Sequence, residues 1–249
     1  MRPVDDDRIQ PLRDPLPLTA ANRDGSAPRA PAVVGLLFWA AAACCLTLTG
    51  PLLLFNPWFV HLEQVRNGSS LRLGTDQATV DRLTATILRE LFTGGDFVVT
   101  VPGRGPLLDS TERSHMQDVG GLVRTLTIAD VVALAVLALS ALALRWEPRR
   151  RGRLLVLASG SVGVAALMAA STLVIGFDAA FLAFHRLLFR EGTYLFGPQS
   201  NLIRLFPEGF WFEASLAAGA AIMVSALAAL LLGARLMRRR DPAEGAGLL

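Results

Sequence analysis

The apolar residues of this chain gather into four long runs, separated by segments in which polar and charged residues are frequent. The runs cover about residues 32–55, 121–144, 154–177 and 212–236. Each run reaches the length of roughly 20 residues that an α-helix needs to cross the hydrocarbon core of a bilayer. The pattern predicts an all-α membrane protein whose four transmembrane helices form one membrane domain within residues 32–240.

The segment between the first two runs, residues 56–120, is too long for a simple connection. Apolar residues recur at helical spacing between Thr75 and Gly94, and the sequence DFVVTVP after them is typical of a short strand. The helical apolar positions are Val80, Leu83, Ile87, Leu88, Leu91 and Phe92. We therefore expect an extracytoplasmic α+β loop domain, whose helix either packs on that domain or lies on the bilayer surface.

The segment between the last two runs, residues 178–211, begins with the sequence DAAFLAFHRLLF. One side of a helix through this sequence is largely apolar and carries one histidine. That side consists of Phe181, Phe184, His185, Leu188 and Phe189. A helix of this kind is typical of the boundary between water and lipid, so the sequence predicts an interfacial helix here.

All 24 basic residues are arginine, and their distribution predicts the orientation of the chain. Fourteen of them lie in residues 1–31, in the short link between the second and third runs, and after the fourth run. Because arginine is enriched in cytoplasmic loops, both termini should be cytoplasmic and the two long loops extracytoplasmic. Residues 1–31 are rich in proline and lack periodicity, which predicts a disordered cytoplasmic tail; residues 241–249 should form a second one.

The composition agrees with a membrane protein, since 52% of the residues are hydrophobic and only 18% are charged. The net charge of +3 reflects the clustered arginines and does not indicate a nucleic-acid partner. The two cysteines, Cys44 and Cys45, are adjacent within the first apolar run, which suits packing better than a disulfide. Because that run continues to Phe55, we expect a retained span and not a cleaved signal peptide.

The three histidines, His61, His115 and His185, all fall in the predicted extracytoplasmic loops. The second and third spans must form an antiparallel hairpin because their link, centred near Arg149, is short. His115 lies 34 residues before this centre and His185 lies 36 residues after it. Two helical paths of nearly equal length therefore predict that these two histidines meet at the outer edge of the membrane.

His115 is surrounded in sequence by charged residues, which makes it a candidate for proton transfer. On a helix Asp118 lies three residues further on and could hold the imidazole in one tautomer. Arg113 could pair with Glu112 or bind a phosphate or carboxylate. His61 has no such neighbours and is expected to be a surface residue. Three histidines and an aspartate could also ligate zinc, although the sequence has neither HExxH nor a His-x-His pair.

Three segments, ERSHMQDV at 112–119, FHRLLFREGTYLF at 184–196 and LIRLFPEGFW at 202–211, resemble a bacterial family of four-span membrane proteins, the lipoprotein intramolecular transacylases (Lit). The resemblance extends over about residues 33–237. It implies an enzyme of the bacterial cytoplasmic membrane that acts on diacylglyceryl-modified lipoproteins and needs no cofactor. The sn-2 acyl chain would move from glycerol to the amino group of the N-terminal cysteine, which gives the lyso form.

The resemblance also implies the site residues. The two functional histidines of the family fall on His115 and His185, and the supporting residues on Glu112, Arg113, Asp118 and Tyr194. A histidine pair can take the proton of the attacking amine and return one to the departing glycerol oxygen. The first assignment makes His115 the base and His185 the partner acid or the oxyanion stabiliser, and the reverse assignment stays open. Tyr194 stands where the family has tryptophan, and residues 199–201 lack its acidic residue.

Two other classes of function remain open from the sequence. In one, the chain is a non-catalytic membrane protein whose extracytoplasmic domain binds an envelope partner, and His115 and Asp118 brace a loop. In the other, it is a metal-dependent membrane hydrolase. A transporter is disfavoured because no acidic or basic residue lies near the middle of a span; Asp130 lies near the outer third of the second run and Asp178 at the end of the third.

Overall fold

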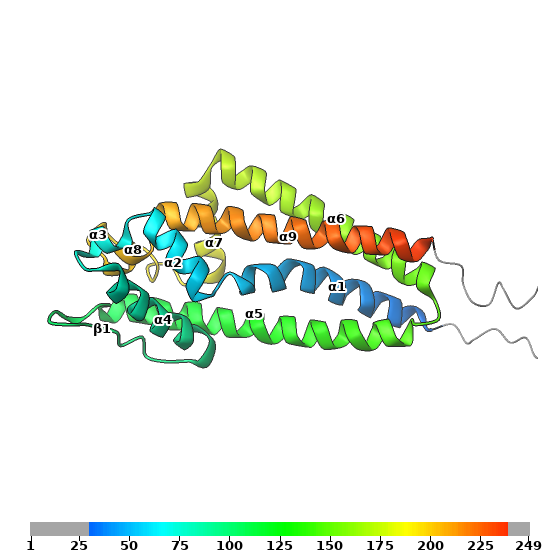
Figure 1. The fold of residues 1–249 in the computed structure, drawn as a ribbon, viewed down its shortest axis with the longest axis horizontal. Helices are drawn as coiled ribbons and strands as arrows, with labels where there is room; N and C mark the ends of the chain where they lie inside the picture. Colours follow the sequence, from blue (N-terminus) through cyan, green and yellow to red (C-terminus); the bar gives the residue numbers. More distant parts are fainter. Residues whose placement is uncertain (1–29, 239–249) are drawn as a thin grey trace, which may run out of the picture.

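A computed structural model describes residues 30–238 of the chain, so the two predicted tails lie almost wholly outside the described residues. Four long helices lie side by side and give the molecule its elongated shape (Figure 1). They are α1 (Ala32–Leu53), α5 (Ser110–Ala143), α6 (Pro148–Ile175) and α9 (Glu208–Met237). All four are long and apolar enough to cross a membrane, as the apolar runs predict.

Large apolar side chains on the outside of these helices are exposed, as lipid contact requires. Ile128 on α5, Leu167 on α6 and Val224 on α9 each leave more than half of their surface uncovered. The bundle has few fully buried residues for its size, because lipid replaces part of the core. The chain is therefore a multi-pass membrane protein.

Helix α5 begins eleven residues earlier than the predicted second span, because its start is strongly capped. The Asp109 carboxylate accepts hydrogen bonds from the backbone N–H groups of Thr111 and Glu112, and Glu112 accepts one from the N–H of Asp109. A helix of 34 residues is about 50 Å long, compared with a hydrocarbon core of about 30 Å. Its first turns, before the apolar run that starts at 121, therefore stand beyond the membrane-spanning part.

The four long helices form two units: α6 with α9 is one, and α5 is the other. Helix α1 lies between these units and packs on both. Helices α6 and α9 make the most extensive helix–helix contact, α5 packs on α1, and α5 and α6 make few contacts with each other. The close approach of α6 and α9 depends on Gly152 and Gly233: a Cβ atom added to Gly152 would lie 2.6 Å from the carbonyl oxygen of Gly233. Between α1 and α5, the Thr49 hydroxyl donates to the Asp130 carboxylate at 2.9 Å.

The short elements gather at one end of the bundle, and we call this part, residues 54–109 and 176–207, the head. It contains α2 (Pro57–Arg66), α3 (Ser69–Leu73), α4 (Gln77–Thr93), α7 (Phe177–Leu188), α8 (Asn201–Leu205) and one small hairpin. The antiparallel strands of the hairpin, β1 (Thr100–Val101) and β2 (Gly105–Pro106), have only two residues each. The start of α1, the end of α9 and the α5–α6 turn lie together at the opposite end (Figure 1).

Helix α4 is the helix predicted from the apolar spacing after Thr75. The Asp76 carboxylate accepts a hydrogen bond from the N–H of Thr79 and so caps its start. Its apolar face is buried in the core of the head, so it packs on its own domain. This core includes Phe59, Val60, Val80, Leu83, Ile87, Leu91, Phe97, Leu107, Leu108, Leu205 and Phe206.

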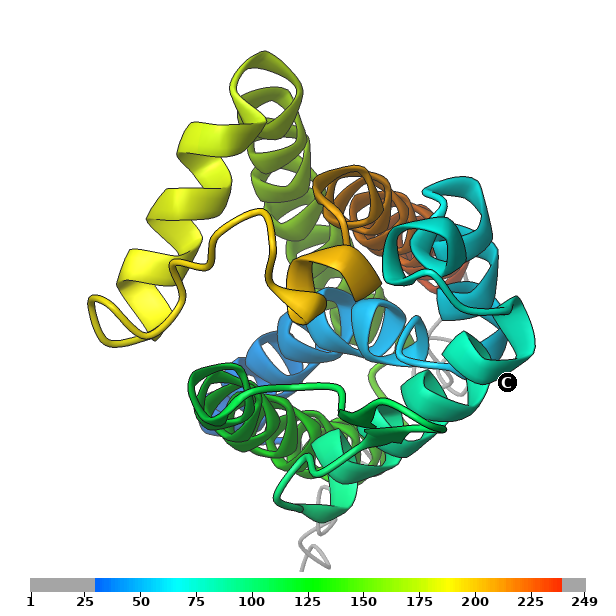
Figure 2. The same cartoon turned by 90° about the vertical axis from the view of Figure 1, so that its left-hand side faces the viewer.

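Helix α7 turns away from α6 at Gly176 and lies to one side of the bundle, running from the end of α6 toward α5 (Figure 2). None of its residues is buried, and Phe184 and Leu187 are 50% and 82% exposed. Such exposure of large apolar side chains distinguishes α7 from α4, whose apolar face is covered.

Candidate functional site

His115 and His185 lie together where α7 approaches the start of α5. Their ring centroids are 6.0 Å apart, and the ring planes are inclined by 26°. His115 stands in the second turn of α5 and His185 in the last turn of α7. The predicted meeting of these two histidines is confirmed. The path to His185 is not one continuous helix, since α6 and α7 are separated at Gly176, but the break does not prevent the contact.

The ring of His115 is enclosed by aromatic side chains and is 6% exposed. The centroids of Phe189 and Phe196 lie 5.0 and 5.5 Å from its own. Nδ1 of His115 is buried and has no hydrogen-bond partner among residues 30–238. Burial, and then the charge of His185, lower the pKa of His115 to about 4, against a smaller opposing effect of Asp118. The imidazole is therefore neutral near pH 7.

His185 is partly buried and has a defined tautomer. Its Nδ1 lies 2.8 Å from the carbonyl oxygen of Phe181, which can only accept a hydrogen bond. The proton of the neutral ring must therefore be on Nδ1, which leaves a lone pair on Nε2. Tyr194, which is 8% exposed, packs beside this ring at 5.3 Å between centroids. The sequence-predicted Tyr194 thus contacts one of the two histidines directly.

Glu112 lies one turn before His115 and joins α5 to α8. Its carboxylate, 2% exposed, accepts hydrogen bonds from the hydroxyl of Ser200 and from the backbone N–H of Leu202, the latter at 3.1 Å. Asn201 adds a third link, since its amide donates to the carbonyl of Leu107 at 2.7 Å. The sequence did not predict this contact of Ser200. The hydroxyl of Ser200 can donate a hydrogen bond to the Glu112 carboxylate, whereas an ionised acidic side chain at this position could not.

Two contacts that the sequence suggested, between Asp118 and His115 and between Arg113 and Glu112, do not form among residues 30–238. Asp118 is exposed and makes no hydrogen bond with His115 in the described part of the chain, so it does not fix the imidazole tautomer. Arg113 forms no ion pair with Glu112 within that part either; its Nε lies 3.4 Å from the carbonyl oxygen of Asp109. Asp118 instead faces an open cleft beside the histidines.

This cleft lies between α5 and the end of α7 and has a volume of about 470 Å³. It is lined by Ser114, Asp118 and Leu122 on α5 and by Leu188, Phe189, Arg190 and Thr193 on the opposite side. Phe189 also contacts both histidine rings, with centroid distances of 5.0 Å to His115 and 5.6 Å to His185. The cleft and the histidine pair therefore share a wall.

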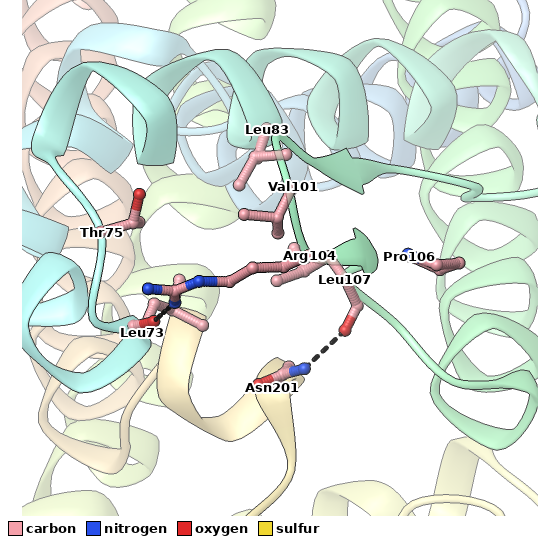
Figure 3. A pocket seen from close by; sticks show the side chains of 8 residues that line it. All are labelled: Leu73, Thr75, Leu83, Val101, Arg104, Pro106, Leu107 and Asn201. Atoms are coloured by element: carbon pink, nitrogen blue, oxygen red, sulfur yellow. Dashed lines mark hydrogen bonds between the residues drawn. The ribbon is translucent and has the colours of Figure 1, made fainter.

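A second, smaller cavity of about 90 Å³ lies beside the hairpin of the head (Figure 3). Arg104 crosses it and donates hydrogen bonds to the carbonyl oxygens of Leu73 and Gly74 at 3.0 and 2.8 Å. Asn201 lines it and is bonded to Leu107. Its polar side chains thus stabilise the head, and neither His115 nor His185 lines it.

His61 is separate from the other two histidines and is paired with an acidic residue. Its Nδ1 lies 2.8 Å from Oδ1 of Asp81, which also accepts a hydrogen bond from Gln77, and its side chain is 46% exposed. This pair links α2 and α4 on the surface of the head. Within residues 30–238, no three His, Cys, Asp or Glu side chains come close enough to hold a metal ion.

The sequence of this chain matches one family of known proteins. The family model described as "Lipoprotein intramolecular transacylase Lit" matches residues 37–211, which include both histidines of the pair. The chain belongs to the Lit family. No curated protein matches the chain in sequence.

Solved structures of Lit from Bacillus cereus share the fold of this Lit family member. One has a TM-score of 0.74 and 16% sequence identity, and the match covers 83% of this chain and 95% of that chain. Two others, from variants in which a histidine is replaced by arginine or by alanine, match with a TM-score of 0.68 at the same identity. They cover 83% of this chain and 92% and 93% of their own.

Proposed function

We propose that this chain is a lipoprotein intramolecular transacylase, which moves the sn-2 acyl chain of a diacylglyceryl lipoprotein to the amino group of its N-terminal cysteine. The observation that carries the proposal is the contact between His115 and His185, at 6.0 Å between ring centroids, within the segment that matches the Lit family. Neither ring approaches a serine or cysteine nucleophile in the ring contacts and hydrogen bonds of the described residues. Direct attack by the substrate's own amine requires none.

The chemistry follows from the two different environments of the histidines. The amine nitrogen attacks the ester carbonyl carbon, a C–N bond forms, and the bond from this carbon to the glycerol oxygen breaks. His185 takes the amine proton through the lone pair on Nε2 and returns it to the departing oxygen. His115, kept neutral by burial, donates a hydrogen bond to the oxyanion of the tetrahedral intermediate. This assignment reverses the first one, in which His115 was the base.

Charge at the far end of the bundle supports an extracytoplasmic head. The first turn of α6 carries Arg149, Arg150 and Arg151, and Arg150 donates to the carbonyl oxygens of Ala30 and Pro31 at 2.7 and 3.1 Å. The chain thus enters α1 beside the arginine-rich turn, at the end opposite the head. In a bacterial cytoplasmic membrane, the enrichment of arginine on the cytoplasmic side leaves both termini inside and the histidine pair outside.

The exposed apolar side of α7 supports contact with the outer leaflet. Phe184, Leu187 and Leu188 are 50%, 82% and 41% exposed on a helix that also carries His185. In this proposal α7 is an interfacial helix, and the acyl chains reach the histidines from the lipid between α5 and α6, which make few contacts with each other. The partners are then diacylglyceryl lipoproteins and membrane lipid, and no cofactor takes part.

The test is mass spectrometry of N-terminal lipopeptides from a bacterial host that lacks its own N-acylating enzymes. Expression of the intact chain should convert diacylglyceryl peptides to peptides that carry one acyl chain on glycerol and one on the cysteine nitrogen. His115→Ala and His185→Ala should each reduce conversion about 100-fold or more, and His61→Ala should leave it unchanged. Unchanged diacylglyceryl peptides with well-folded protein would contradict the proposal and favour a non-catalytic, partner-binding protein.

A further inference from the structure

The cleft beside the histidine pair contains two opposite charges that do not pair with each other. Asp118 comes from α5 and Arg190 from the segment after α7, and both line the cleft of about 470 Å³. Both residues are exposed, and neither side chain takes part in a hydrogen bond or ion pair in the described range 30–238. An acidic and a basic group that share a cleft without contact can bind a ligand with complementary groups of its own.

The other lining residues set the character of that ligand. Ser114 and Thr193 contribute hydroxyl groups, whereas Leu122, Leu188 and Phe189 are apolar. The volume lies within the range of roughly 300–1,000 Å³ that is usual for small-molecule sites. A ligand that fits this arrangement has a short polar chain with a positively charged group at its end, and an apolar group attached to that chain.

We infer that the cleft binds the amino terminus of a polypeptide, with Asp118 accepting hydrogen bonds from the α-ammonium group and Arg190 donating to a peptide carbonyl oxygen of the first residues. The inference rests on the proposed function, because it names the part of the lipoprotein that lies beside the reacting ester. Asp118 stands one helical turn after His115, so the bound amino terminus lies next to the histidine pair. The shared wall at Phe189 gives the attached lipid a direct path to the two rings.

This binding mode has a consequence for product release. The bound ammonium group first loses one proton to solvent; the resulting amine then attacks the ester, and its second proton passes through His185 to the glycerol oxygen. The product is a neutral amide, which no longer carries the charge that Asp118 binds. The same loss excludes lipoproteins that are already N-acylated. Asp118 is therefore a specificity residue, which acts on the amine before His185 removes a proton from it.

The test uses the full-length protein in detergent and a lipopeptide in which both glycerol esters are replaced by ethers, so that no acyl transfer occurs. One form has a free α-amine and the other an acetylated α-amine. The intact chain should bind the free-amine form about tenfold more tightly, as loss of one charge-assisted hydrogen bond predicts. Asp118→Asn should reduce this ratio to within about twofold, and Asp118→Glu should restore part of it. Asp96→Asn, which removes an exposed acid elsewhere in the head, should leave it unchanged.

Arg190→Gln should weaken the binding of both forms of the lipopeptide by a similar factor, because both forms have peptide carbonyl groups. Arg186→Gln, four residues earlier on α7, is its matched control. If Asp118→Asn still bound the free-amine form about tenfold more tightly than the acetylated form, the inference would be overturned. His185→Ala separates it from the proposed function: this variant should lose acyl transfer and keep the preference for the free amine. If the intact chain shows the Asp118-dependent preference but transfers no acyl chain, the transacylase proposal fails and the amino-terminus site stands.

Discussion

The Glu112 carboxylate accepts a hydrogen bond from the backbone N–H of Leu202 at 3.1 Å, and so joins two segments that are far apart in the sequence. The same carboxylate accepts from the N–H of Asp109 and the hydroxyl of Ser200. It is thus the point where the start of the His115-bearing helix is fixed to the segment that follows Phe196, one of the rings against His115. Three hydrogen-bond donors surround this carboxylate. If an amide replaced it, the amide NH2 group would face one of these donors and could not accept its hydrogen bond.

Glu112→Gln should therefore lower both stability and acyl transfer. We expect a loss of about 2 kcal/mol in the free energy of unfolding, because a buried hydrogen-bonding group loses an acceptor. Thermal unfolding in detergent and lipopeptide mass spectrometry measure the two effects. Glu191→Gln, an exposed acid in the segment after α7, is the control and should behave like the intact chain. An unchanged melting temperature in Glu112→Gln would refute the role of this carboxylate.

The depressed pKa of His115, about 4, predicts a loss of stability in mild acid. The unfolded chain takes up a proton at the ordinary histidine pKa near 6.5, while the folded chain does so only near 4. The stability that this residue contributes is thus fully present above pH 6.5 and is lost as the pH falls toward 4, by up to about 3 kcal/mol. Melting temperatures between pH 7 and pH 4.5 should fall less in His115→Gln than in the intact chain. His61→Gln should follow the intact chain, and an equal fall in all three would contradict the prediction.

Glu63 on α2 predicts the opposite trend, a loss of stability as the pH rises from about 4.5 to about 7. It is 4% exposed and lies beside Glu213 of α9, which also contacts Arg66 at 3.2 Å. Burial first, and then the hydrogen bond and charge of Glu213, raise the pKa of Glu63 to about 7, although Arg66 partly opposes this. Stability from the protonated Glu63 is complete below its unfolded pKa near 4.5 and is lost as the pH rises through 7. Glu63→Gln should remove this decline, measured as the difference in melting temperature between pH 4.5 and pH 8.

The glycine contact between α6 and α9 predicts a steric cost for any side chain there. A Cβ atom at Gly152 would lie 2.6 Å from the carbonyl oxygen of Gly233, and one at Gly233 would lie 2.8 Å from that of Gly152. Gly152→Ala should destabilise the bundle by about 1–3 kcal/mol, because two backbones must move apart. Gly160→Ala, on the same helix but facing open space, should be neutral or slightly stabilising. Equal melting temperatures for both variants would show that the two helices are not packed this closely.

The parts of the structure that could be predicted from sequence are those that depend on one-dimensional patterns. Hydropathy is sufficient for the four long helices, and periodicity for α4, because both reflect burial repeated along one element. The meeting of His115 and His185 also follows from counting residues along a hairpin. The early start of α5 depends instead on a capping box at Asp109, a local signal that hydropathy hides.

The relations that the sequence could not give depend on side-chain direction and on distant partners. The i, i+3 spacing allows Asp118 to reach His115, yet the carboxylate faces the cleft, since spacing alone does not determine where a side chain points. Ser200 and Phe196 come from a segment without regular secondary structure, whose path is fixed only by contacts with α5 and α7. The strand expected after α4 is reduced to two residues, because within residues 30–238 it pairs only with the other arm of a tight hairpin.

The division of the long helices into two units means that the histidine pair is assembled from both. His115 moves with α5, which packs on α1 and α4, while His185 is connected through Gly176 to α6, which packs on α9. The distance of 6.0 Å between the two rings therefore depends on the position of α6, which is held against α9 at the contact of Gly152 with Gly233. Because α5 and α6 make few direct contacts, the distance between the two rings depends on how each of these helices packs on α1.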